Sequence, residues 1–368
     1  MDARVASLAR QLLDHSLNLQ PGEKLLIEGE TGCEELVRGL IAEAHARGAL
    51  PFFELVDPRL RRAQLLGASR ELLDIEMAWR LARVHDVDAR LHILAGANLS
   101  ELADVPPEIM VEGHQASRPV LEEGLKKKWV VLRFPNAAGA QAAGMSTDGF
   151  EDYCYRVSSL DYAAMDRAMD PLVALMAATK VVRITGPGTD LTLRLEGLPV
   201  VKCAGRFNVP DGEVFTAPTL DSAEGVIAFS APAVFDGVSC DDVTLTFEAG
   251  RVVKATGSPQ AKIDAVFDTD KGARFLGEFA LAMNPHIERP MKDVLYDEKI
   301  RGSLHLAVGL AYDMADNGNR SAIHWDLVLI QTPEWGGGEV WFDGVLVRKD
   351  GRFVLPELQA LNPERLAG

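Results

Sequence analysis

The sequence predicts an α/β protein of two domains, and three observations lead to this fold class. Strand and helix signals alternate along the first half, as in parallel sheets that are covered by helices. After Lys180, short alternating runs separated by Gly and Pro replace this rhythm, which is typical of antiparallel strands. The 368 residues also suit two domains of ordinary size. We therefore expect an N-terminal α/β domain with a parallel sheet over residues 1–180 and a C-terminal, mostly antiparallel α+β domain over residues 181–368.

The first half consists of apolar stripes at helical spacing and of short apolar runs. The stripes predict helices that begin near Val5, Cys33 and Ser69, the last of which is a favourable N-cap residue. Gly48 stands where the glycine that ends a helix belongs. The short runs predict strands at residues 24–27, 50–56, 90–94 and 129–134. This alternating order predicts the parallel sheet.

The second half begins after a helix that we expect over residues 162–178. Residues 180–196 contain two alternating runs around a Gly-Pro-Gly turn and predict a hairpin. Further short strands are expected at residues 226–229, 243–247 and 251–255. In the first half, the small residues of the segment 137–143 predict a flexible loop.

The balance of charge excludes two classes of partner. The chain has 38 Lys and Arg against 54 Asp and Glu, which gives a formal charge of −16. Binding to nucleic acid requires a basic face for the phosphates, and an anionic membrane surface also attracts basic residues. We therefore expect neither nucleic acid nor a membrane as a partner.

Cysteine use and the lack of long apolar runs predict a cytoplasmic protein. Four cysteines without a C-x-x-C pair do not make a disulfide framework, so reduced thiols are expected. No run of 18 uncharged apolar residues occurs, and the N-terminal residues lack the apolar core of a signal peptide.

Several familiar catalytic motifs are absent. No G-x-G-x-x-G follows the first strand and no G-x-x-x-x-G-K-[ST] occurs, so nucleotide binding has no support. The zinc motif H-E-x-x-H and the serine-hydrolase motif G-x-S-x-G are absent as well.

Four short phrases in the second half carry side chains that can do chemistry. Glu213 follows a turn in N-V-P-D-G-E-V-F-T-A-P, and Glu278 begins an apolar run in L-G-E-F-A-L-A-M. The other two phrases are S-L-H-L-A-V-G-L-A-Y, with His305 and Tyr312, and S-A-I-H-W-D-L-V-L-I, with His324 and Asp326. In a strand, His324 and Asp326 would point to the same face, and burying them without partners would be costly.

The pattern alone leaves simpler interpretations open. A Glu after a turn is usually a solvated residue at the rim of a sheet, and this is the simpler interpretation of Glu213. A single His in an apolar segment, such as His305, is usually a hydrogen-bonded core residue. His324 and Asp326 could form a structural pair, and His286 after Asn-Pro is expected in a loop.

In their order, the four phrases resemble the M29 metallopeptidases, the thermophilic aminopeptidase family of the aminopeptidase T and S types. The segments G-E-K-L-L-I at Gly22 and G-P-G-T-D-L at Gly186 add to the resemblance. It implies two divalent metal ions, such as Zn, Co, Mn or Mg, held by two Glu, two His, an Asp and a Tyr. The matching positions are Glu213, Glu278, His305, Tyr312, His324 and Asp326.

The resemblance implies an aminopeptidase that hydrolyses the N-terminal peptide bond of peptides with a metal-bound hydroxide. Three carboxylates and two divalent ions would leave one positive charge, which a bridging hydroxide could balance. Such a hydroxide exists at neutral pH because metal binding lowers the pKa of water. Glu213, Glu278 and Tyr312 would be catalytic, with one of the two Glu as proton shuttle. The resemblance also implies a homodimer. The stretch from Tyr312 to His324 is shorter than usual for the family, which leaves the substrate preference open.

Two other functions remain as alternatives. A ring-cleaving dioxygenase of 2,5-dihydroxypyridine resembles this family in fold and uses one non-haem iron, for which His305, His324 and Asp326 could serve. It ranks second because Glu213 and Glu278 are both present and a single iron would not need them. A peptide- or metal-binding protein without catalysis ranks third.

Overall fold

The computed structural model describes residues 2–235 and 237–367, and the chain divides into two compact units. Unit 1 comprises residues 1–159 and 205–209, and unit 2 comprises residues 160–204 and 210–368. The sequence predicts a domain boundary near residue 180, whereas the compact units divide at residue 160. The reason is that helices α8 (Tyr162–Ala168) and α9 (Asp170–Ala178) pack against the 3₁₀ helix η5 (Pro356–Leu361) near the C-terminus.

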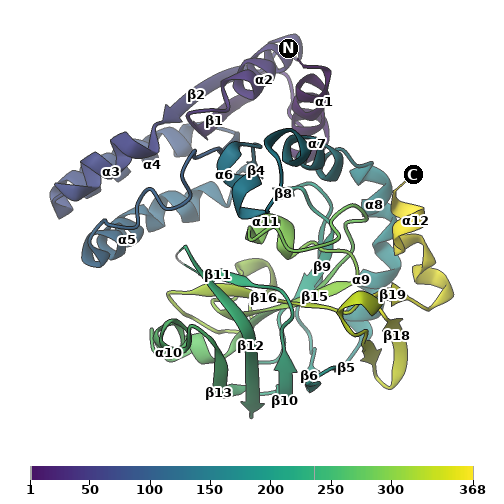
Figure 1. Cartoon of the computed structure of the whole chain (residues 1–368). Coiled ribbons are helices and arrows are strands. Elements are labelled where there is room, and N and C mark those ends of the chain that lie inside the picture. Colours follow the sequence, from purple (N-terminus) through teal and green to yellow (C-terminus); the bar gives the residue numbers. More distant parts are fainter. Residues whose placement is uncertain (1, 236, 368) are drawn as a thin grey trace. The chain divides into compact units, whose positions relative to one another are not determined.

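Unit 1 contains the predicted parallel sheet (Figure 1). Its five strands lie in the order β2-β1-β3-β4-β8, and all neighbours are parallel. The strands are β1 (Lys24–Glu30), β2 (Leu50–Val56), β3 (Ala89–Leu94), β4 (Lys128–Arg133) and β8 (Asn208–Val209). The helices are α1 (Ala3–Gln11), η1 (Leu12–Ser16), α2 (Glu34–Ala46), α3 (Pro58–Leu66), α4 (Arg70–Asp86), α5 (Pro107–Gly124), α6 (Ala137–Ala142) and α7 (Thr147–Ser158). Apolar side chains of α3, α4 and α5 share one core with Leu26 of β1.

Local signals explain where some of these helices begin. Ser69 caps α4 as predicted, because its Oγ accepts a hydrogen bond from the Leu72 N–H at 3.2 Å. The prediction of a flexible loop over residues 137–143 is wrong, since most of this segment forms α6. Alanine has the highest helix propensity, and the Asn136 side chain caps this helix by accepting from the Gly139 N–H at 2.9 Å.

The fifth strand of this sheet comes from a distant part of the sequence. β8 pairs in parallel with β4, and the ring of Phe207 lies 5.0 Å from the ring of Trp129. Residues 205–209 therefore belong to unit 1, although the residues on either side of them belong to unit 2.

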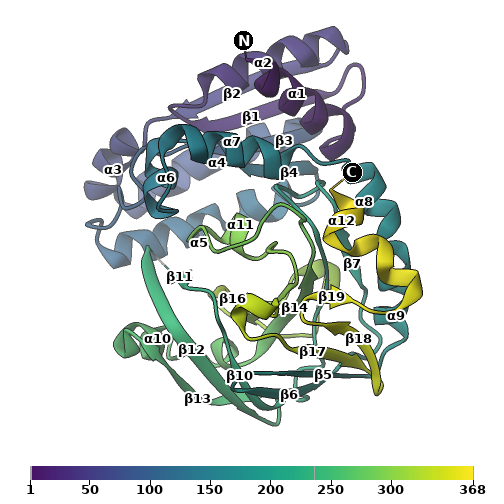
Figure 2. The same ribbon diagram turned by 45° about the vertical axis from the view of Figure 1, so that its right-hand side comes forward.

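Unit 2 contains two antiparallel sheets (Figure 2). The larger has nine strands in the order β11-β12-β10-β6-β5-β17-β18-β19, with β13 paired to β12. Its strands are β5 (Val181–Gly186), β6 (Thr189–Arg194), β10 (Glu224–Ala228), β11 (Ala233–Phe235), β12 (Val238–Glu248), β13 (Arg251–Ser258), β17 (Glu339–Phe342), β18 (Val345–Lys349) and β19 (Arg352–Phe353). β5 and β6 form the hairpin predicted around the Gly-Pro-Gly turn. The parallel sheet and the two antiparallel sheets confirm the predicted fold class.

The smaller sheet of unit 2 is the buried one. Its five strands lie in the order β16-β15-β14-β9-β7. They are β7 (Val201–Cys203), β9 (Glu213–Thr216), β14 (Leu276–Ala282), β15 (Ser303–Gly309) and β16 (His324–Ile330). Every residue of β9, β14 and β15 is buried, so any polar side chain on these strands must find its partner inside the protein.

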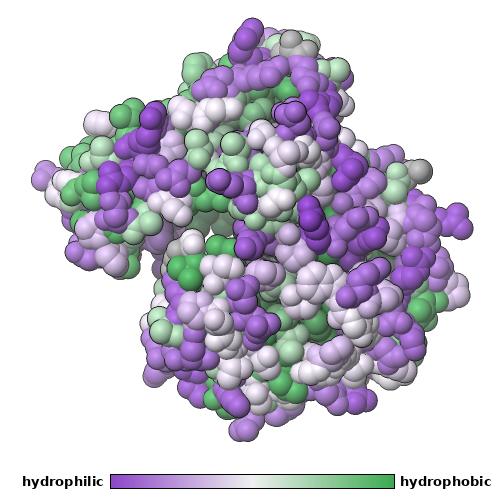
Figure 3. Space-filling model, in the orientation of Figure 1, coloured by the Kyte–Doolittle hydropathy of each residue, from purple (hydrophilic) through white to green (hydrophobic). Residues whose placement is uncertain are grey.

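The helices of unit 2 are short. The helix expected over residues 162–178 is divided into α8 and α9, because Pro171 lies in the first turn of α9 and cannot continue the preceding helix. The others are α10 (Gln260–Phe267), α11 (Val294–Asp297), α12 (Pro363–Leu366), η2 (Gly272–Arg274), η3 (Asp313–Ala315) and η4 (Pro333–Trp335). Among the described residues, no helix is long and apolar enough to cross a membrane. Hydrophilic residues cover much of the face in Figure 3, between smaller hydrophobic patches.

Candidate metal centre

The smaller sheet brings together side chains that are far apart in the sequence. Glu213 begins β9, Glu278 lies on β14 and His305 on β15. β16 begins with His324 and continues to Asp326. Because β9, β14, β15 and β16 are neighbours in this sheet, five of the six predicted site residues lie on adjacent strands.

The strand register places these side chains on one face and leaves space between them. His305 lies opposite Ala280, and Glu213 lies opposite Ala282. Ala307 is the partner of both Glu278 and Asp326, and Gly309 is the partner of His324. Each of these polar side chains thus faces a small residue on one neighbouring strand, although His305 also lies opposite Val328 on β16. Larger partners would fill the space into which the carboxylates and imidazoles project.

The first half of the cluster consists of Glu213, Glu278 and His305. One potential ligand atom from each lies within 4.8 Å of the other two. The His305 Nε2 is 3.3 Å from the Glu278 Oε1 and 3.5 Å from the Glu213 Oε2. All three residues are at most 4% exposed.

The second half consists of Glu278, His324 and Asp326. The His324 Nε2 is 3.5 Å from the Glu278 Oε2 and 3.3 Å from the Asp326 Oδ1. Glu278 therefore presents one carboxylate oxygen to each histidine. The two halves of the cluster therefore share this residue.

Backbone carbonyls fix the orientation of both imidazoles. The Nδ1–H of His305 donates to the carbonyl of Glu298 at 3.1 Å, and the Nδ1–H of His324 donates to the carbonyl of Leu310 at 2.8 Å. Carbonyls only accept hydrogen bonds, so the proton of the neutral ring is on Nδ1 in both cases. In the neutral form, each Nε2 would direct its lone pair into the cluster, as in histidines that bind metals.

The electrostatics of the cluster favour the presence of cations. Burial favours a neutral His305, but the charges of Glu213 and Glu278 outweigh it and raise its pKa to about 9. Burial likewise opposes the charge on His324, yet Asp326 and Glu278 raise its pKa to about 10. Burial also raises the pKa of Glu278. Without a bound metal ion, the carboxylates around His305 and His324 therefore keep both imidazoles protonated at neutral pH.

A divalent metal ion fits this set of donors. The Glu213 Oε2 is buried and has no hydrogen-bond partner among the residues that the structure describes. A buried carboxylate oxygen without a partner is costly, and an ion beside it would remove that cost. Carboxylate oxygens and imidazole nitrogens are ligands of zinc and of related divalent metals.

Tyr312 lies beside the cluster, just after β15. The centre of its ring is 4.6 Å from the centre of the His324 ring. The ring of Phe215 lies edge-on to it, with 6.1 Å between the two ring centres. Tyr312 is 40% exposed. The loss of part of its solvent contact and the charges of Glu278 and Asp326 raise the pKa of Tyr312 well above the usual value, so its hydroxyl is protonated at neutral pH.

The structure adds charged residues that no motif of the sequence indicates. Glu298 has a carboxylate oxygen within 4.8 Å of ligand atoms of His305 and Asp326. Lys299 is completely buried, with its Nζ 2.5 Å from the Glu213 Oε1 and 2.8 Å from the Glu298 Oε1. In the sequence both belong to D-E-K-I-R, which is typical of a solvated charged segment. By contrast, His286 lies in a turn, as expected.

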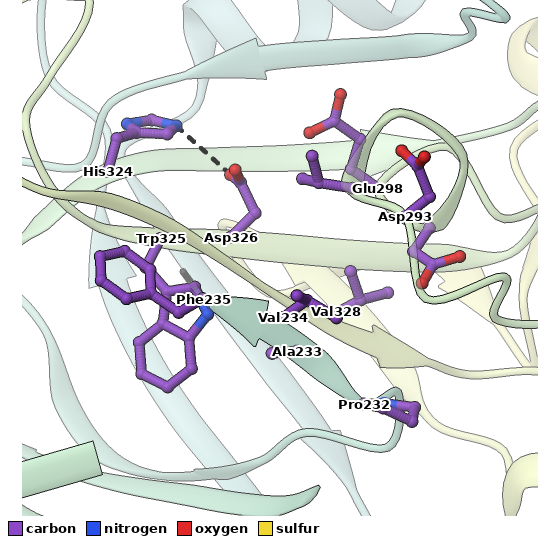
Figure 4. Close-up of a pocket in the computed structure, with 12 residues that line it drawn as sticks. Pro232, Ala233, Val234, Phe235, Asp293, Glu298, His324, Trp325, Asp326 and Val328 are labelled. Atoms are coloured by element: carbon purple, nitrogen blue, oxygen red, sulfur yellow. Dashed lines mark ion pairs between the residues drawn. The ribbon is translucent and has the colours of Figure 1, made fainter. Parts of the chain in front are cut away.

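A cavity of about 120 Å³ borders the cluster (Figure 4). His324 and Asp326 lie on one side of it, and Glu298 and Asp293 lie on the opposite side. Val234 and other apolar side chains complete its wall. The cavity therefore combines carboxylates with an apolar surface next to the candidate metal ligands.

The fold and the cluster together define a class: an α/β protein with a candidate metal centre on the face of an antiparallel sheet. The chain belongs to the thermophilic metalloprotease (M29) family, whose sequence profile matches residues 1–353. This match confirms the family resemblance of the four phrases and the hydrolase class that it implies.

Named relatives of similar length support the same family. Aminopeptidase T of Thermus thermophilus is 28% identical over 96% of this chain and 100% of its own. Aminopeptidase PepS of Streptococcus thermophilus is 26% identical over 92% of this chain and 93% of its own. The solved structure of wild-type AmpT from Thermus thermophilus aligns with a TM-score of 0.83 at 26% identity, covering 96% of this chain and 99% of that one.

Proposed function

We propose that this chain is a metal-dependent aminopeptidase whose centre holds two divalent ions. The observation that supports two ions is the position of Glu278, which presents one oxygen to His305 and the other to His324. The names of the relatives support the activity, because aminopeptidase T and PepS are aminopeptidases.

The ligands divide into two sets that share one carboxylate. Glu213, Glu278 and His305 would hold the first ion, and Glu278, His324 and Asp326 would hold the second. Tyr312 is a further ligand or a hydrogen-bond donor to the oxyanion of the reacting carbonyl, as the family resemblance implies. Bound ions of this kind activate water as a nucleophile and polarise the scissile carbonyl.

The residues around the centre orient the substrate. Carboxylates such as Asp293 and Glu298 line the cavity and favour a positively charged group, which the free amino terminus of a peptide provides. Apolar residues such as Val234 and Val328 offer contacts for a side chain. The buried strands β14 and β15 keep bulk water away from the opposite face of the sheet.

Metal content and hydrolysis test the proposal together. We expect about two Zn, Co or Mn ions per chain, and hydrolysis of leucyl-p-nitroanilide that stops with a chelator and returns with metal. The same substrate with an acetylated amino group is the control, because an aminopeptidase requires the free amine. One iron per chain with oxygen uptake on a hydroxylated pyridine would instead support the dioxygenase.

Some expectations about the whole protein stay predictions. The homodimer and the cytoplasmic location follow from the family resemblance and from the composition. Gel filtration with light scattering would measure the oligomeric state.

A further inference from the structure

Lys299 is a buried cation that has no part in the reaction described so far. It is 0% exposed, and its Nζ lies 2.5 Å from the Glu213 Oε1, 2.8 Å from the Glu298 Oε1 and 3.7 Å from the Asp211 Oδ1. An ammonium group without water requires carboxylate partners. Lys299 is therefore held among three carboxylates at one edge of the candidate metal centre.

The contact with Lys299 distinguishes the two oxygens of Glu213. The Oε1 faces the ammonium group, whereas the Oε2 lies 3.5 Å from the His305 Nε2 and accepts no hydrogen bond within the described part of the chain. The last torsion of a glutamate side chain is broad, so little else selects which oxygen points where. The ion pair supplies that selection.

We propose that Lys299 is a positioning residue that fixes Glu213 with a single oxygen directed at the metal ion in the first ligand set. The inference rests on the proposed metal-dependent function. Lys299 is 0% exposed and its Nζ lies against the Glu213 Oε1, so it acts through Glu213.

The charges around the centre support a permanent cation at this position. Asp211, Glu213, Glu278, Glu298 and Asp326 carry five negative charges when ionised. Two divalent ions and Lys299 would carry five positive charges, so a cation at the position of Lys299 would help to balance these carboxylates. Metal sites in proteins depend on such outer partners, which orient the ligands.

A simpler role for Lys299 makes the opposite prediction. If the lysine only neutralised nearby carboxylates, its removal would leave the centre more negative. By Coulomb's law the centre would then attract divalent cations at least as strongly as before. A positioning role predicts weaker binding, because Glu213 loses its fixed orientation. The sign of the change in metal affinity therefore separates the two roles.

The test is the substitution Lys299→Met in the full chain, loaded with Co²⁺ in competition with a chromophoric chelator. We expect one of the two equivalents to bind roughly 10- to 100-fold more weakly. We also expect the visible absorption of that Co²⁺ to change, because its ligand geometry changes. Unchanged or tighter binding with an unchanged spectrum would overturn the proposal.

A second variant covers the case in which this substitution prevents folding. Lys299→Met with Asp211→Asn keeps the net charge of the cluster, and the Asn side-chain oxygen can still accept from the Gly212 N–H as the Asp211 Oδ1 does at 2.9 Å. The same loss of affinity is expected in this double variant, and wild-type affinity there counts against positioning.

Lys202→Met is the matched control, since Lys202 also pairs with two carboxylates in unit 2, Asp166 and Asp170. It should leave the binding of Co²⁺ unchanged.

The wild-type chain separates the proposed function from the proposed role of Lys299: if it binds no divalent metal, the proposed function fails. If it binds metal and hydrolyses peptides but Lys299→Met behaves like wild type, only the role of Lys299 fails.

Discussion

Glu278 is the residue on which both ligand sets depend. Its two oxygens face two different histidines, and it is only 3% exposed. Glu213 contributes to one set alone. The two glutamates should therefore differ in what their loss does to metal content.

Glu278→Gln should remove both ions, whereas Glu213→Gln should weaken the binding of one. An amide has one oxygen and one donor group, so it cannot ligate two cations. The loss of several kcal/mol of transition-state stabilisation predicts a fall in kcat/KM of roughly 10³-fold or more for either variant. Elemental analysis gives ions per chain, and leucyl-p-nitroanilide hydrolysis gives activity.

The control for these variants is Glu288→Gln. Glu288 is an exposed residue of the same unit that pairs with Arg301 at 2.8 Å. The Glu288→Gln variant should retain both metal ions and full activity. Full activity in Glu278→Gln or Glu213→Gln would contradict the assignment of the ligands.

The histidines predict how the stability of the metal-free protein depends on pH. The pKa of His305 is raised to about 9 and that of His324 to about 10, above the value near 6.5 of an unfolded chain. A raised pKa in the folded state adds stability that is complete below the unfolded pKa and disappears as the pH rises through the folded one. In excess chelator, the Tm should therefore fall between pH 7 and pH 10.

Metal-loaded protein provides the comparison for this pH series. Bound metal keeps the imidazoles neutral, so the Tm of the loaded protein should fall less over the same interval. Thermal melts at each pH measure both forms. Parallel curves for the two forms would show that these histidines do not hold extra protons in the metal-free state.

Among the elements, the turn before β9 decides where Glu213 points. Gly212 has φ +138°, and a Cβ added there would come within 3.0 Å of the backbone nitrogen of Asn284. Asn284 also donates from its side chain to the Asp211 carbonyl at 2.8 Å, and the Met283 N–H donates to the Gly212 carbonyl. The turn is thus held against the end of β14 on both sides.

Gly212→Ala should destabilise the protein by roughly 1–3 kcal/mol and weaken metal binding, because relief of the clash moves Glu213. Gly197→Ala is the control in the same unit. Gly197 has φ +70° with nothing within 4 Å of an added Cβ, so only backbone strain of about 1 kcal/mol applies. Urea unfolding and Co²⁺ titration compare the variants, and equal metal affinity would mean that the turn does not control Glu213.

At the scale of the whole molecule, every candidate ligand lies in unit 2. Metal at 1,000 times its Kd would stabilise the folded state by about 4 kcal/mol. A chelator should therefore speed amide hydrogen exchange in β14, β15 and β16 and leave β1 and β3 of unit 1 unchanged. Mass spectrometry of peptides measures this, and equal acceleration in both units would contradict a site confined to unit 2.

The sequence predicts the fold class and the members of the cluster but not their surroundings. Alternating apolar runs identify most strands, and the order of the four phrases identifies Glu213, Glu278, His305 and the His324–Asp326 pair. Lys299 could not be found this way, because only tertiary packing distinguishes its buried ammonium from a solvated one. The two residues of β8 are too few to give a periodic pattern.

That short strand has a consequence for any attempt to divide the protein. The chain leaves unit 1 at residue 159, returns at 205 and leaves again at 209, four residues before Glu213. A protease that cuts between residues 159 and 160 would release no separate fragments under native conditions, since β8 would stay paired with β4. Expression of residues 160–368 alone would instead leave Phe207 and Val209 without their sheet, and expression of residues 1–159 alone would leave β4 without its partner β8. The two units are distinct in packing, yet no single break in the backbone makes them separable.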